Sequence, residues 1–273
     1  MTATEFKMLV TTGHVTLLLG TSFLLGSCIP QLVMFISSQG LLGSDGQSKP
    51  SLRNKYLKDW TDEERRFVLT RLFKDFMLVV LFVLQHSLMA GERWKRFLLR
   101  CDIYISERLI YVMASCFTLT LLMRNWASTP DVMLWGMDTE NHSLHWLFFC
   151  ALHTAAWLLL FLQVAVMDPW ELIGVEQVYN HYKGKASPLS YVPKQLRIFY
   201  QHLRHAGPTS LWLMLWVHPV MTMDRFLLAL IFSVFLAMAH QVSLADYKFA
   251  QSYFVYEEST TFCTVRPRPY RDY

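Results

Sequence analysis

The sequence predicts an all-α fold: a polytopic membrane bundle of about six transmembrane helices, the last two forming a hairpin. Two observations lead to this prediction. Of the 273 residues, 53% are apolar or aromatic and only 17% are charged. In soluble chains, about a quarter of the residues are charged. The charges are also crowded between long apolar runs, as they are in multi-span membrane proteins. We expect one integral membrane domain over residues 1–273 and no separate soluble module.

The apolar runs define the expected spans, because a helix needs roughly 17 to 25 residues to cross a bilayer. The spans are expected at approximately residues 8–36, 76–90, 109–123, 144–167, 206–221 and 226–244. A short polar turn at residues 222–225 separates the last two runs and predicts the hairpin. A polar and aromatic tail follows at residues 247–273.

The first span carries small residues at Gly13, Gly20 and Gly26. Such residues let a neighbouring helix approach closely, so we expect this span to be packed in a bundle. His14 lies in the same span, and we expect it to be a hydrogen-bonded structural histidine rather than a ligand.

A helix start is predicted at residues 61–64, where the sequence reads Thr-Asp-Glu-Glu. Thr61 and Glu64 have the spacing of a capping box. Acidic residues in the first turn also face the positive end of the helix dipole. This helix is expected to run through Arg71 and Lys74 into the second span.

The second span ends in three adjacent polar residues, Gln85, His86 and Ser87. Polar side chains at the end of an apolar helix must face protein or water rather than lipid. Two interpretations stay open for them: hydrogen bonds to a neighbouring helix, or contact with a cofactor.

The placement of basic residues predicts that both termini lie in the cytoplasm or nucleoplasm. Basic residues are frequent in the second loop, at residues 93–108, and in the fourth, at 183–204, whereas the third loop has only Arg124 and the last hairpin turn only Arg225. The first loop is also basic, which opposes this orientation. The first loop is given less weight than the others because half of its basic residues belong to the helix that enters the second span. The sequon at Asn141 is then expected to face the lumen.

On this orientation, several ionisable residues fall near the cytoplasmic or nucleoplasmic ends of the helices. Convergence of ionisable groups at a membrane-embedded rim predicts a site, although side chains reaching for the interface and ordinary helix capping are an equal alternative. The residues do not identify a catalytic group. The candidate cofactor-binding residues are His86, Arg204, His205, His240 and Asp246.

The sequence lacks the residue patterns of disulfide, metal and nucleic-acid sites. The five cysteines form no C-x-x-C pair, so free thiols acting as small apolar groups are expected rather than disulfides or zinc. A di-iron oxidase needs several histidine clusters, and only His202 and His205 form a short pair, so no metal is predicted. No basic cluster with stacking aromatics lies outside the loops that flank the membrane, so nucleic acid is excluded as a partner.

Four segments carry a resemblance to a known family: QHSLMA at residues 85–90, ELIG at 171–174, HLRH at 202–205 and DRFLLA at 224–229. On these segments, which occur in order over most of the chain, the sequence resembles the nurim family of multi-span proteins of the inner nuclear membrane. It is more distantly similar to the isoprenylcysteine carboxyl methyltransferases. The first resemblance implies residence in the inner nuclear membrane, continuous with the endoplasmic reticulum. The partners it implies are membrane lipids and further proteins of the nuclear envelope.

No cofactor follows from the residues alone, but the distant resemblance implies S-adenosylmethionine. Arg204 and His205 match the start of the Arg-His-Pro element of the methyltransferases, but Ala206 follows in place of proline. Asp246 stands where those enzymes have paired glutamates. Because positioning supplies most of the rate of methyl transfer to a carboxylate, these departures favour a methyltransferase-like fold without catalysis.

Two functions from different classes follow. The first is a non-enzymatic multi-pass protein of the inner nuclear membrane. The second is an S-adenosylmethionine-dependent methyltransferase or a lipid-modifying enzyme that acts at the nucleoplasmic or cytoplasmic rim.

Overall fold

The computed structural model describes most of the apolar part of the chain. The described residues are 3–38, 60–101, 103–130, 132–137, 139, 141–166, 169–183 and 206–239. The chain divides into two compact units, residues 1–234 and 235–273, and the second is described only at residues 235–239, the end of the last described helix. The tail at 247–273 lies outside the described residues, and the single-domain organisation stays a prediction.

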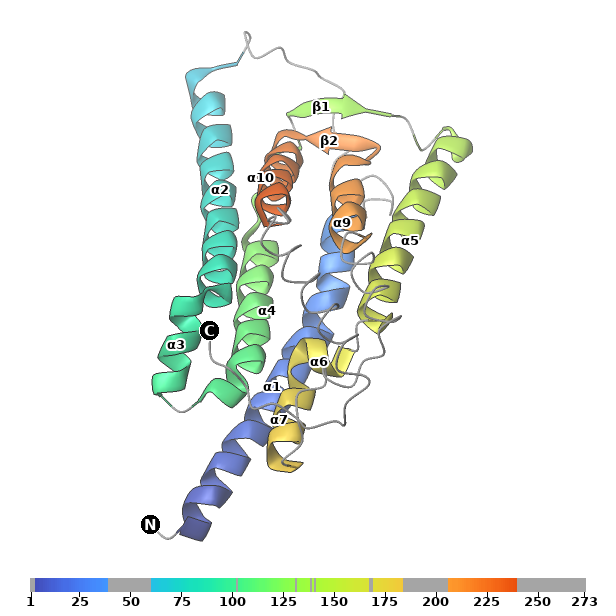
Figure 1. The fold of residues 1–273 in the computed structure, drawn as a ribbon. Helices are drawn as coiled ribbons and strands as arrows, with labels where there is room; N and C mark the ends of the chain where they lie inside the picture. The colour runs from blue at the N-terminus through green and yellow to red at the C-terminus, as the bar shows by residue number, and fades with distance from the viewer. Residues whose placement is uncertain are drawn as a thin grey trace, which may run out of the picture. The chain divides into compact units, whose positions relative to one another are not determined.

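The described elements are almost all helical, which confirms the helical membrane bundle (Figure 1). In chain order they are α1 Ala3–Ser37, α2 Asp62–Ala90, α3 Glu92–Arg100, the 3-10 helix η2 Tyr104–Ser106, α4 Glu107–Asn125, β1 Met133–Gly136, α5 Ser143–Val166, α6 Pro169–Ile173, α7 Val175–Lys183, α9 Ala206–Trp216, β2 Val220–Thr222 and α10 Met223–Ala239.

Three described helices contain a stretch long and apolar enough to cross a membrane. These stretches are Thr12–Ser37, Tyr104–Asn125 and Ser143–Ala165. They fall in the first, third and fourth of the expected spans. The total of about six spans stays a prediction.

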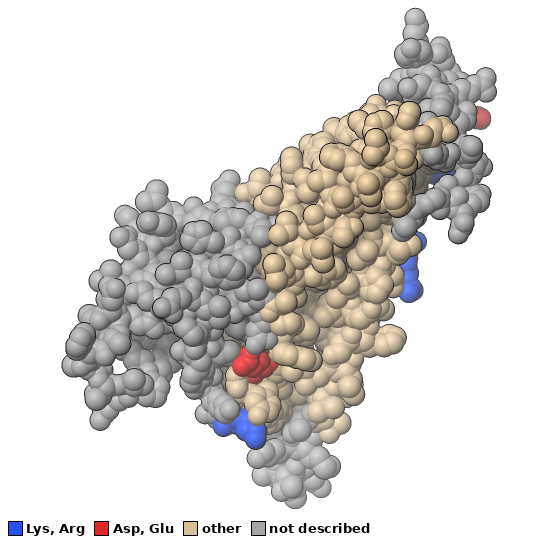
Figure 2. Space-filling model, turned by 90° about the vertical axis from the view of Figure 1, so that its right-hand side faces the viewer, with Lys and Arg blue, Asp and Glu red and all other residues tan. Residues whose placement is uncertain are grey.

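Large apolar side chains cover the outside of the helices. Phe23 in α1 is 76% exposed and Leu158 in α5 is 63% exposed. On the face of the molecule in Figure 2, the described side chains are mostly uncharged, and only a few charged ones are seen. Such a surface is far more apolar than that of a soluble protein, and it is suited to contact with lipid.

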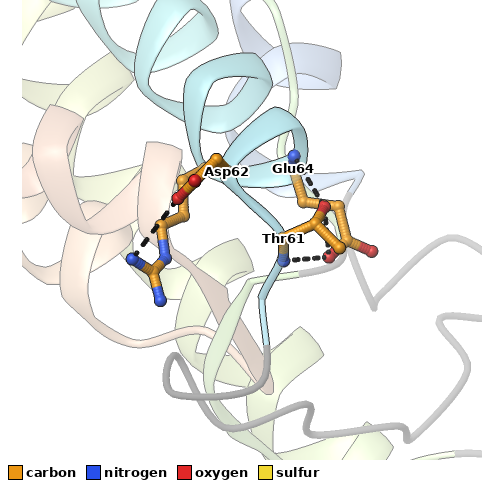
Figure 3. A network of polar contacts seen from close by, with 4 residues as sticks. Thr61, Asp62 and Glu64 are labelled. Atoms are coloured by element: carbon orange, nitrogen blue, oxygen red, sulfur yellow. Dashed lines mark hydrogen bonds and ion pairs between the residues drawn. The ribbon is translucent and has the colours of Figure 1, made fainter.

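The start of α2 has the predicted capping box (Figure 3). The Thr61 backbone N–H donates to Glu64 Oε2 at 2.8 Å, and the Glu64 N–H donates to Thr61 Oγ1 at 3.3 Å. These bonds satisfy backbone donors that have no partner within the helix. Asp62 and Arg65 add an exposed ion pair one turn apart, at 3.9 Å. The sequence therefore fixes where this helix begins.

The buried apolar residues form two clusters that meet at α9. The first joins α2, α4, α9 and α10 through Val79, Phe82, Leu122, Leu215, Leu228 and Ala229. The second joins α1, α5 and α9 through Ile36, Ala156, Trp157 and Met214. Because the adjacent residues Met214 and Leu215 belong to different clusters, α9 is the helix around which both halves of the core pack.

A two-stranded antiparallel ribbon joins the α4–α5 connection to the α9–α10 connection. Met133 pairs with Thr222 and Gly136 with Val220, with an irregularity between Met133 and Trp135. The Met137 backbone N–H extends the ribbon by donating to the carbonyl of Pro219 at 2.8 Å. This ribbon was not predicted from the sequence.

The last hairpin differs from its predicted form. Helix α9 ends at Trp216 instead of residue 221, and residues 220–222 form β2. Residues 223–225, expected in the turn, are the first turn of α10. The physical reason is Pro219, which disfavours helical geometry at His218, while Asp224 favours a helix start.

The first span is packed in the bundle, as predicted, through helix α4. Although α1 packs against α4, a Cβ atom placed on Gly13, Gly20 or Gly26 would have no described neighbour within 4 Å.

Candidate functional site

A set of polar side chains, here called the His86 cluster, connects α2 to α4. It consists of Gln85, His86, Tyr111, Ser115 and Thr118. The Tyr111 hydroxyl lies 2.7 Å from His86 Nε2, and the Ser115 hydroxyl lies 3.4 Å from His86 Nδ1. Thr118 donates to Gln85 Oε1 at 3.0 Å, and Gln85 Nε2 donates to Ser115 at 3.4 Å. Gln85 and His86 therefore form hydrogen bonds to a neighbouring helix, which is the first of the two interpretations.

Aromatic rings fix the orientation of the His86 imidazole. Phe82 stacks against it with ring centroids 5.5 Å apart, and Tyr111 lies tilted at 5.0 Å. Phe82 in turn stacks on Phe232 of α10 at 5.8 Å. His86 is therefore held by three helices, α2, α4 and α10, at the position where the sequence predicted a site residue.

The end of the bundle that holds the His86 cluster also contains a turn that requires glycine. Gly174, between α6 and α7, has φ 94°, a conformation that strains any residue with a side chain. A Cβ atom there would lie 2.6 Å from Arg108 Cβ. The Arg108 Nε donates to the carbonyl of Leu172 at 3.1 Å. This close approach anchors the α6–α7 segment to the start of α4.

His14 is a structural histidine, as expected. It is buried at 8% exposure, and its Nδ1 lies 2.7 Å from the hydroxyl of Tyr182. The two rings meet edge to face, with centroids 5.7 Å apart. The pair connects α1 to α7.

The other four candidate residues, Arg204, His205, His240 and Asp246, lie outside the described residues. Their convergence with His86 stays a prediction. Within the described ranges, no group of three or more His, Cys, Asp or Glu side chains is placed so that it could hold a metal ion.

A second set of polar residues, the Asp224 cluster, lies beside the β1–β2 ribbon. It consists of Asp75, Trp126, Thr129, Asp224 and Arg225. The Asp224 carboxylate is fully buried and accepts three hydrogen bonds: from Trp126 Nε1 at 2.8 Å, from the Thr129 hydroxyl at 2.8 Å and from the Thr129 backbone N–H at 3.2 Å. Asp224 therefore ties the first turn of α10 to the connection that follows α4.

Asp75 and Arg225 place two more charges in this cluster. Asp75 is fully buried, and its Oδ1 accepts the Ala127 N–H at 2.8 Å. Burial raises the pKa of the Asp75 carboxyl to about 6, and the nearby carboxylate of Asp224 adds to the rise. The guanidinium of Arg225 lies 4.3 Å from the centre of the Phe35 ring. Burial lowers the pKa of Arg225 to about 10, against the attraction of Asp224 and Asp75, so this side chain stays charged at neutral pH.

A third set of polar contacts joins the middle of α5 to the ends of α1 and α9. His153 Nε2 donates to the carbonyl of Val217 at 2.7 Å, and its Nδ1 lies 3.0 Å from the Ser37 hydroxyl. Trp157 Nε1 donates to the same hydroxyl at 2.9 Å. The ring of His218 meets His153 edge to face, with centroids 4.7 Å apart. Ser37 thereby receives contacts from two residues of α5.

Sequence reasoning did not single out the Asp224 cluster as a site, although signals were present. Asp75 borders an apolar run, and Asp224 and Arg225 stand between two others. Ionisable residues at such places are rare unless they have partners. The partners Trp126 and Thr129 carry no such signal, because they lie in a connection without a recognisable pattern.

The chain is similar in sequence to Nurim proteins from several animals. The protein called Nurim from Rattus norvegicus is 38% identical over 226 residues, which covers 81% of this chain and 84% of the relative. Nurim from Homo sapiens is 36% identical over the same shares. The chain belongs to the nurim family. The Nurim homolog of Drosophila melanogaster is 31% identical over 172 residues, 63% of this chain and 68% of the relative.

Membership of the nurim family and the apolar helices together identify a multi-pass membrane protein. No protein-family model matches the chain, and no solved structure matches it. The DRFLLA segment that carried part of the nurim resemblance begins with the two buried charges of the Asp224 cluster. The ELIG segment ends in the glycine with positive φ. Both segments therefore coincide with places where the fold constrains the residue type.

Proposed function

We propose that this nurim-family chain is a non-enzymatic, multi-pass integral protein of the inner nuclear membrane, with a methyltransferase-like fold. Support for the location comes from nurim family membership. Lipids surround the exposed apolar helices, and proteins of the nuclear envelope are the partners that would retain the chain there.

The observation that carries the proposal is that polar side chains of the described bundle are used to join helices. His86 bonds to Tyr111 across α2 and α4, and Asp224 accepts three bonds from the connection after α4. His153 joins α5 to the ends of α1 and α9. Because each interaction satisfies a polar group that would be costly in lipid, the arrangement supports a structural role.

Departures from the methyltransferase pattern support the same conclusion. Ala206 follows Arg204 and His205 where the distant relatives have proline, and Asp246 stands where they have paired glutamates. A cofactor held by fewer positioned groups loses the orientation on which methyl transfer depends. The fold is therefore proposed to persist without the reaction.

The location is tested by electron microscopy with immunogold labelling of a tagged full-length chain at low expression. We expect most particles on the inner nuclear membrane and few in the peripheral endoplasmic reticulum. An equal density of gold over both membranes contradicts the proposed residence.

The absence of an enzymatic role is tested by titrating the purified full-length chain with S-adenosylmethionine in a calorimeter. We expect no saturable heat at millimolar cofactor. Saturable binding that is lost in Arg204→Ala and in His205→Ala, but kept in the control Arg65→Ala, establishes the methyltransferase alternative instead. Arg65 is a suitable control because it is exposed and lies in the first turn of α2.

A further inference from the structure

Helix α3, with the sequence ERWKRFLLR, directly follows α2 at the end of the bundle away from the β1–β2 ribbon (Figure 1). Gly91 separates the two helices in an extended conformation, with φ −79° and ψ 152°. The chain therefore turns at Gly91, and α3 is a separate helix at the end of the second predicted span. The distribution of basic residues predicts that this end faces the cytoplasm or nucleoplasm.

One part of α3 is anchored in the protein and another is exposed. Leu98 is 1% exposed and fixes the helix to the bundle, whereas Phe97 and Leu99 are 52% and 53% exposed. Trp94 packs on Phe97, with ring centroids 5.6 Å apart. A short helix with exposed aromatic and aliphatic side chains beside cationic ones is typical of helices that lie in the membrane interface.

Three arginines of α3 lie together. Arg93, Arg96 and Arg100 are spaced three and four residues apart, which places them on one side of a helix. With Phe97 they line an open surface depression of about 320 Å³. The cation Lys95 is already paired with Glu92 at 3.4 Å. No acidic side chain of the described residues is recorded within ion-pair distance of the three guanidinium groups.

We propose that this arginine face, formed by Arg93, Arg96, Phe97 and Arg100, binds the phosphate-bearing headgroup of an anionic phospholipid. Guanidinium groups match phosphate oxygens in geometry and charge. Phe97 and Leu99 would enter the adjoining acyl region, which a free phosphate ion does not provide. The leaflet predicted to lie at this end is the one that carries anionic lipids, so charge and position agree.

The test uses the purified full-length chain in an uncharged detergent at low salt. Binding of dioctanoyl phosphatidylinositol 4-phosphate is measured by thermophoresis and compared with dioctanoyl phosphatidylcholine and inorganic phosphate. A basic residue near an anionic membrane surface contributes a factor of about five in affinity. We therefore expect Arg96→Gln to weaken binding about fivefold, and Arg93→Gln, Arg96→Gln and Arg100→Gln combined to weaken it on the order of 100-fold.

The matched control is a triple variant, Arg65→Gln, Arg66→Gln and Arg124→Gln, which removes the same charge from exposed positions elsewhere. It is expected to bind the anionic lipid as the parent chain does. Equal binding of the phosphatidylcholine, equal binding of inorganic phosphate, or an equal loss in the control overturns the proposal. So does a short duplex DNA that binds the arginine face more tightly than the lipid. If the triple variant does not fold, unchanged binding in Arg96→Gln has the same consequence.

Discussion

Replacing Asp224 by alanine is expected to destabilise the bundle strongly. The change removes a fully buried carboxylate that accepts from the Trp126 indole and from both the hydroxyl and the backbone N–H of Thr129. The hydroxyl can turn to another acceptor, but the backbone N–H of buried Thr129 and the indole N–H of half-buried Trp126 lose their partner, at about 1–3 kcal/mol each. Arg225 also loses a nearby counter-charge. Because Asp75 stays as a second counter-charge to Arg225, the two lost N–H partners dominate, and a total loss of about 2–6 kcal/mol is expected.

The measurement is the free energy of unfolding in mixed micelles, followed by tryptophan fluorescence during titration with a denaturing detergent. Asp224→Asn keeps one carbonyl oxygen as an acceptor, so its loss should be smaller, about 1–3 kcal/mol. Asp62→Ala is the matched control, because its carboxylate is 90% exposed and exposed pairs contribute little.

The expected order of stability is the parent chain and Asp62→Ala first, then Asp224→Asn, then Asp224→Ala. If Asp224→Ala unfolds at the same detergent fraction as Asp62→Ala, the buried carboxylate does not hold α10 in the way described. A double-mutant cycle with Thr129→Val adds an independent check. Residues in contact should show a coupling free energy of about 0.5–3 kcal/mol.

Three further changes test other parts of the fold. Gly174→Ala should destabilise by about 1–3 kcal/mol because φ is positive and Arg108 Cβ is 2.6 Å away, whereas the control Gly20→Ala, with open space around it, should show no loss in the same detergent titration. Asp75→Asn should gain stability relative to the parent as pH rises from about 4 to 7. The reason is that the pKa of the Asp75 carboxyl is raised to about 6 in the folded chain. Such a carboxyl contributes stability that is complete below its unfolded pKa and is lost as pH rises through its folded pKa. A difference in unfolding free energy between the two chains that stays constant with pH contradicts this. Thr61→Ala should cost about 1 kcal/mol through the lost cap, and unchanged helix content and stability would show that the capping box is dispensable.

Local sequence patterns predicted the start of α2 and the contacts of several polar residues within the long helices. The capping residues Thr61 and Glu64 act within one turn, so their geometry follows from spacing alone. The polar residues Gln85 and His86 had to face protein because lipid offers no hydrogen bonds, and they do bond to α4. His14 likewise forms a hydrogen bond to Tyr182 of α7.

Features that depend on distant residues were not predicted. Strands β1 and β2 have four and three residues, too few to show an alternating pattern. Their pairing joins residues that are far apart in sequence, and no local signal reports such a contact. The end of α9 at Trp216 could have been read from Pro219, but the apolar run continues past it and favoured a longer helix. The Asp224 cluster was also not predicted, because Thr129 and Asp224 are distant in sequence and meet only in the folded chain.

The pairing of β1 with β2 has a consequence for biosynthesis. Residues 133–136 leave the ribosome long before their partners at 220–222, so the ribbon cannot form until the segment between α9 and α10 has been made. Until then the indole of Trp126 and the amide of Thr129 lack the carboxylate of Asp224. A nascent chain that stops before residue 220 therefore exposes an unfinished strand and unsatisfied donors, which are features by which membrane quality control could distinguish it from a completed molecule.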